Sequence, residues 1–115
     1  MAQLTAVSVP TGQATAVAPL AVSASDTILA SDIGENGALL NVINGSGGSI
    51  NVTILDPGTT AVGNVGTAVA QPVPNGQDRW FVIGKGHVNP ATGVATVTYS
   101  GTTTVTYKLV RGPAR

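Results

Sequence analysis

The stretch of sequence that most restricts the fold is residues 38–54, which reads ALLNVINGSGGSINVTI. Residues 38–43 form a nearly continuous apolar run, the pattern of a strand buried on both faces. In residues 49–54 the apolar Ile50, Val52 and Ile54 alternate with polar residues, so one face of a second strand is expected to be buried. Because a Gly- and Ser-rich segment joins the two, the stretch predicts a β-hairpin.

Two further stretches carry strand patterns. Residues 95–99 and 105–109 alternate around Ser100-Gly101 and predict a second hairpin, in which Tyr99 and Tyr107 share the packed face. Residues 78–83, DRWFVI, contain the single Trp and the single Phe of the chain, and we expect Trp80 to pack in the core or at a subunit interface. Shorter candidates bring the expected number of strands to seven or eight.

The composition agrees with an all-β chain. Hydrophobic residues make up 43% of the sequence but aromatic residues only 3%, so the apolar content is mainly Ala and Val, and good helix formers such as Glu and Lys are scarce. We therefore predict a small antiparallel β-sandwich or barrel of about 7–8 strands with an extended N-terminal segment. The 115 residues fit one domain, residues 26–111. Residues 1–25 are expected to be an N-terminal arm or edge strands that anchor no core, and residues 112–115 a frayed tail.

The charges limit the partners that the chain can bind. Charged residues make up 9% of the sequence and sum to zero, so the clustered cations that nucleic acids or anionic membranes require are missing. A neutral surface gives little repulsion between copies and favours self-association. The absence of cysteine, of a secretory leader and of a long apolar span favours a protein made in the cytoplasm.

No catalytic, metal-binding or cofactor-binding constellation is visible, and we expect a protein that is not an enzyme. The single histidine, His87, is expected to be an exposed loop residue. Asp26, Asp32 and Glu35 lack the fuller ligand pattern of a calcium loop, and turn or cap roles are expected instead. A sugar-stacking platform of Trp80 with Tyr99 and Tyr107 stays open as an alternative to packing.

The ordered set of motifs resembles a family of small virion proteins of tailed phages. The set consists of an apolar strand ending in Asn-Gly-Ser-Gly, a strand of the type Ile-x-Val-Thr-Ile, an Asp-Pro-Gly turn, a Pro-rich segment, a strand of large apolar residues, and an Asn-Pro-Ala-Thr-Gly loop leading into Val-x-Val-Thr-Tyr-Ser. In this chain these pieces are residues 40–47, 50–54, 56–58, 69–74, 80–83, 89–93 and 94–100. The resemblance covers about residues 36–110, and we connect the family with capsid decoration (cement) proteins.

The resemblance implies a structural role on the virion. A protein of this type binds the outer face of the capsid, often as a homotrimer, and bridges neighbouring copies of the major capsid protein, which stabilises the shell. The alternatives are a carbohydrate-binding or adhesion module, and a minor tail or head-completion component. We expect the following residues at the interface: Val7, Val9, Pro10, Pro19, Trp80, Phe81 and His87.

Overall fold

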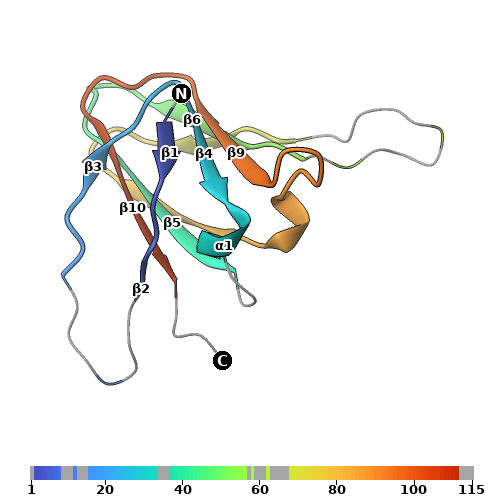
Figure 1. Ribbon diagram of the computed structural model, residues 1–115. Helices are drawn as coiled ribbons and strands as arrows, with labels where there is room; N and C mark the ends of the chain where they lie inside the picture. Colours follow the sequence, from blue (N-terminus) through green and yellow to red (C-terminus); the bar gives the residue numbers. More distant parts are fainter. Residues whose placement is uncertain are drawn as a thin grey trace.

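The computed structural model describes residues 2–8, 12, 16–33, 37–56, 58, 62 and 68–111. Within them, ten strands form two sheets that pack face to face as a β-sandwich (Figure 1). The predicted all-β class is confirmed. The number of strands exceeds the expected seven or eight, because three short strands of two or three residues lie within residues 2–21.

The first sheet has the order β1-β4-β9-β6-β7. Its antiparallel part is built around β9, which pairs with β4 on one side and β6 on the other, while β1 adds in parallel to β4. The bounds of these strands are β1 Ala2–Leu4, β4 Ser25–Leu29, β6 Ile50–Ile54, β7 Gln71–Val73 and β9 Val94–Tyr99.

The second sheet has the order β2-β10-β5-β8, and β3 pairs with the other end of β10. Its bounds are β2 Val7–Ser8, β3 Leu20–Ala21, β5 Ala38–Asn44, β8 Asp78–Ile83 and β10 Val105–Arg111. Two short helical turns complete the described fold, α1 (Ala30–Ile33) after β4 and η1 (Lys85–His87) after β8.

Both predicted hairpins are wrong. β5 lies in the second sheet and β6 in the first, and β9 and β10 are divided in the same way (Figure 1). Each connection is therefore an arch across the core rather than a hairpin turn. The two arches interlock, because β5 pairs with β10 over its whole length and β6 pairs with β9. Alternation of apolar and polar residues is the same for two strands in one sheet and for two strands facing each other, which is why the sequence pattern did not distinguish them.

The core lies between the interlocked arches. Val42 and Leu109 from the second sheet, and Val52 and Val97 from the first, are 0–1% exposed. Burying each such side chain contributes about 1.5–3 kcal/mol relative to leaving it in water. β5 was expected to be buried on both faces, but its outer face is partly open, since Leu39 is 43% exposed.

Residues near the N-terminus also contribute to this core. Leu4 in β1 is 1% exposed and Val22, just after β3, is 9% exposed. The expectation that residues 1–25 anchor no core is therefore wrong for these two positions. The backbone N–H of Val22 also donates to the carbonyl oxygen of Val105 at 3.2 Å, which ties this segment to β10.

Two buried polar side chains are satisfied within the fold. Asn44, at the end of β5, uses its amide to join the first arch to β7: its nitrogen donates to the carbonyl oxygens of Gly48 (2.7 Å) and Val73 (2.8 Å), and its oxygen accepts from Ser46. Asp26 in β4 is fully buried and accepts hydrogen bonds from the backbone N–H and the hydroxyl of Ser23. A buried carboxylate is stable only with such partners.

Candidate binding surfaces

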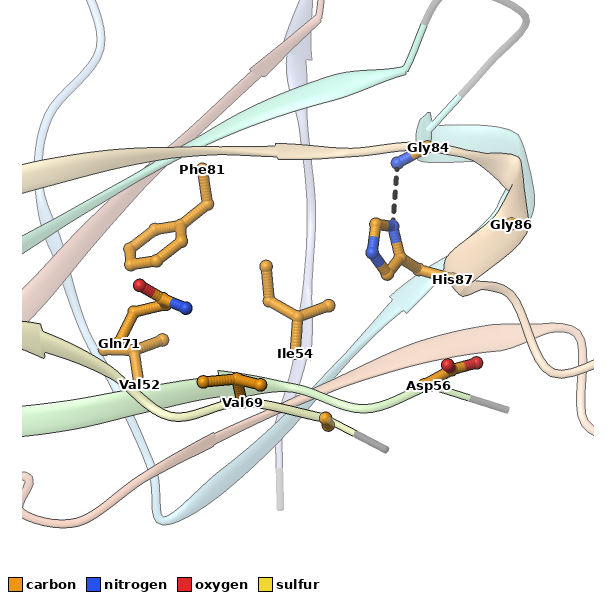
Figure 2. Close-up of a pocket in the computed structure, with 10 residues that line it drawn as sticks. Val52, Ile54, Asp56, Val69, Gln71, Phe81, Gly84, Gly86 and His87 are labelled. Carbon is orange, nitrogen blue, oxygen red and sulfur yellow. Dashed lines mark hydrogen bonds between the residues drawn. The ribbon is translucent and has the colours of Figure 1, made fainter. Parts of the chain in front are cut away.

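A groove separates β8 from β6 and β7 on one side of the sandwich. Two adjoining cavities of about 520 and 480 Å³ form it, and both are lined by Ile54, Gln71 and Phe81. Figure 2 shows the Phe81 ring on β8 pointing towards Gln71 and Ile54 on the opposite wall. We call this feature the β7–β8 groove. Its centre is mainly apolar, and charged side chains lie towards its ends.

The two ends of the groove carry opposite charges. At the end where β8 finishes, Asp56 and His87 are among the lining residues. At the end where β8 begins, Arg79 lines it together with Trp80 and Pro72. The groove therefore has the carboxylate of Asp56 at one end, which can bind a cation, and the guanidinium cation of Arg79 at the other.

His87 differs from its predicted role as an exposed loop histidine. It is half-buried at the end of η1, and the backbone N–H of Gly84 donates to its Nδ1 atom at 3.2 Å (Figure 2). This hydrogen bond orients the ring, with Asp56 on the opposite wall of the same cavity. Of the expected interface residues, His87, Phe81 and Trp80 thus line one groove, which the sequence pattern did not indicate.

A second candidate surface is the outer face of the second sheet. Strand pairing places Val7, Val110, Leu39 and Val82 in one row across β2, β10, β5 and β8. Val7 is 37% exposed, Leu39 43% and Val82 66%. Four apolar side chains in a single cross-strand row, three of them open to solvent, mark this face for contact with another surface.

Trp80 lies on the same outer face. It is 56% exposed and pairs with Asn41 of β5, whereas the next residue, Phe81, turns inward and is half-buried. Core packing of Trp80 is therefore excluded. The apolar run 80–83 belongs to the terminal strand of a sheet, so only alternate residues reach the core.

Tyr99 and Tyr107 do not join Trp80 in a platform. Both are buried, at 7% and 6% exposure, on β9 and β10 in different sheets. Burial, together with the negative charge of nearby Asp26, raises the pKa of both tyrosine hydroxyls above the ordinary value. The packed face that Tyr99 and Tyr107 were expected to share is therefore the interior of the sandwich. The alternative of a sugar-stacking platform built from Trp80, Tyr99 and Tyr107 is wrong.

The remaining sequence candidates are dispersed. Pro19 is exposed beside β3, while Val9 and Pro10 lie outside the described residues. Asp32 lies in α1, Asp26 is buried in β4, and Glu35 also lies outside the described residues. In the part of the chain that the structure describes, no three metal-ligating side chains come together.

Comparison with models of protein families, with curated proteins and with solved structures finds no match to this chain. The surfaces must therefore be interpreted from their own chemistry. None of the helices in the described ranges has the length and apolar character needed to cross a bilayer.

Sequence reasoning missed several residues of both surfaces. Leu39 was assigned to a strand buried on both faces, and no role was predicted for Val82, but strand pairing places both on the exposed outer face of the second sheet. Asp56 was predicted only as part of a turn and Arg79 only as part of a strand, because they are far apart in the sequence and the fold alone brings them to one groove.

Proposed function

We propose that this chain is a structural virion protein that binds the outer surface of a tailed-phage capsid and stabilises the shell by bridging major capsid subunits. The ordered motifs of residues 36–110 support this role through their resemblance to decoration proteins. The observation that carries it is the exposed apolar row of Val7, Leu39 and Val82 on the outer face of the second sheet. Such a row suits a broad and nearly neutral protein surface.

The mechanism is one of linked equilibria. A protein that binds only the assembled shell stabilises that shell by mass action. Each contact can be weak, because the subunits of the shell are already held in place and many identical contacts act together. A chain with zero net charge adds no electrostatic repulsion when many copies cover one particle.

Sedimentation of particles from the source lysate on a sucrose gradient tests this function. Co-migration of the chain with the most abundant shell protein at a fixed, high ratio is the expected result. A few copies per particle would instead indicate a tail or head-completion component. Recovery of all of the chain at the top of the gradient would refute a virion role.

Binding of purified protein to shells that lack it tests the proposed face. Leu39→Asp places a charge in the middle of the apolar row, and we expect it to lower occupancy at least tenfold. Val62→Asp is a matched control, because Val62 is 84% exposed and is not part of the row. Equal loss in both variants, or in neither, would contradict the assignment of this face.

A carbohydrate-binding or adhesion module is a second candidate, favoured by the 56% exposure of Trp80. A single exposed indole can stack on a sugar ring, although the tyrosines cannot assist it. Binding on a glycan array that Trp80→Ala abolishes while the fold is retained would support this candidate. Absence of binding to any glycan would remove it.

A further inference from the structure

β8 is the least protected edge of the sandwich. The other terminal strands are short: β1 has three residues, β2 has two, and β7 has three with Pro72 at its centre. β8 has six residues, contains neither proline nor glycine, carries its charged residues Asp78 and Arg79 only at its start, and exposes Trp80 and Val82 in its apolar second part. Proteins usually block such an edge with proline, with charge or with short length, because its free N–H and C=O groups invite another strand.

We propose that β8 pairs antiparallel with β8 of a second copy of this chain, around a two-fold axis through Phe81. The register follows from the faces of the strand. Pairing with β5 shows that Arg79, Phe81 and Ile83 belong to the inner face and Trp80 and Val82 to the outer face. Directly opposite residues of antiparallel strands share a face, so a continuous sheet requires inner residues to meet inner residues. The Phe81-centred register satisfies this and overlaps residues 79–83.

This register matches the apolar side chains of the two copies. On the outer face, Trp80 lies opposite Val82 of the second copy, and the same contact recurs across the axis. On the inner face the second strand covers the β7–β8 groove, where Ile54 and Gln71 of the first sheet are half-buried or exposed. The groove therefore lies where the next strand of the second sheet would pack.

The charges at the ends of the groove match as well. The axis places Arg79 of the second copy opposite Ile83, at the end of the groove that Asp56 lines. Two Asp56–Arg79 pairs form in this way, one at each end. Within one copy the Arg79 guanidinium donates to the exposed Gln77 side chain (2.8 Å) and to the Asp78 carbonyl (2.7 Å), and water can take the place of both acceptors.

The symmetry of this contact fixes the size of the assembly. A patch that pairs with its own copy closes as a dimer. The threefold assembly that the resemblance implies cannot form through it. The inference does not depend on the capsid role, because it rests on the edge strand and the groove alone.

The mass of the full chain in solution is the first test. Sedimentation equilibrium should give a concentration-dependent mass that approaches twice 11.4 kDa. Trp80 emission should shift to shorter wavelength over the same concentration range, because Val82 of the second copy packs beside the indole and reduces its contact with water. A monomer throughout, or a trimer, would overturn the proposal.

Charge reversal tests the geometry. Arg79→Glu and Asp56→Lys each create two like-charge pairs, and each should weaken the dimer by roughly 100-fold. An equimolar mixture of the two variants restores both pairs in a heterodimer, and the double variant restores them in a homodimer. Lys108→Glu, a reversal of the same sign on the outer face of β10, is the control and should leave the dimer unchanged. Two outcomes would overturn the proposed register even if the unsubstituted chain dimerises. One is a dimer that neither charge reversal weakens, and the other is an equimolar mixture of the two variants that remains monomeric.

Discussion

Replacement of Asn44 by alanine should destabilise the fold by clearly more than a surface substitution. The Asn44 side chain is 1% exposed and joins three segments, the end of β5, the arch that leads to β6, and β7. Its loss removes the side-chain donor that reaches the carbonyl oxygen of Val73, a fully buried residue, at 2.8 Å, while the β6–β7 pairing leaves that carbonyl its backbone donor, Ile50. Loss of such a buried hydrogen bond costs about 0.5–1.5 kcal/mol.

The other contacts of Asn44 add less to the cost. The bonds to Gly48 and Ser46 lie at a partly exposed loop, where water replaces them, and their loss costs about 0.5–1 kcal/mol each. The free energy of unfolding should therefore fall by about 2–3 kcal/mol. For a chain of this size that change lowers Tm by roughly 7–12 °C.

Urea unfolding followed by far-ultraviolet circular dichroism measures this loss at fixed protein concentration. Asn51→Ala is the control, because the Asn51 side chain is exposed on β6, and it should change the free energy of unfolding by less than about 0.5 kcal/mol. Asn44→Asp should be more destabilising than Asn44→Ala near neutral pH, since it turns a carboxylate oxygen towards two carbonyl oxygens. A loss below about 1 kcal/mol for Asn44→Ala, at an unchanged urea m-value, would refute the reasoning.

Three further predictions concern the tyrosines, Trp80 and one glycine. Because burial and Asp26 raise the pKa of Tyr99 and Tyr107 above 10.0, the unfolded chain loses its phenolic protons first, and stability should fall above about pH 10, with Tyr99 alone contributing about 1.4 kcal/mol per pH unit. Urea unfolding at about pH 9 and about pH 11 checks this, and equal stability at both would contradict it. Dilute protein should show red-shifted Trp80 emission that acrylamide quenches readily, and a blue-shifted, protected signal would contradict the exposed position. Gly37 has φ +83°, and a Cβ there would lie 3.1 Å from the carbonyl oxygen of Ile83, so Gly37→Ala should lower the free energy of unfolding by about 1–2 kcal/mol. An unchanged Tm would count against it.

The strands themselves were largely predictable from the sequence. The expected segments 38–43, 49–54, 78–83, 95–99 and 105–109 correspond closely to β5, β6, β8, β9 and β10. Val, Ile and Thr at alternate positions determine these segments locally, through the fit of branched side chains to a pleated sheet. The all-β class follows from the same residues.

The partners of the strands were not predictable. An arch and a hairpin bury the same alternate residues, so the pattern of residues 38–54 is compatible with both. The position of β8 at the edge of the second sheet also depends on which strands pair. Trp80 is exposed rather than buried because β8 occupies that edge. The groove escaped prediction for the same reason, because its walls come from residues about 25 positions apart, such as Ile54 and Phe81.

The interlocked arches also determine when the chain can fold during its synthesis. β5 is paired with β10, whose residues leave the ribosome more than 60 positions later. At roughly 5–20 residues per second, the apolar β5 remains without β10 for about 3–13 s, and until then it has only the edge strand β8 as a partner. Nascent chains stalled before Val105 should therefore stay protease-sensitive and bind chaperones, whereas chains extended past Arg111 and clear of the exit tunnel should become resistant in a single step.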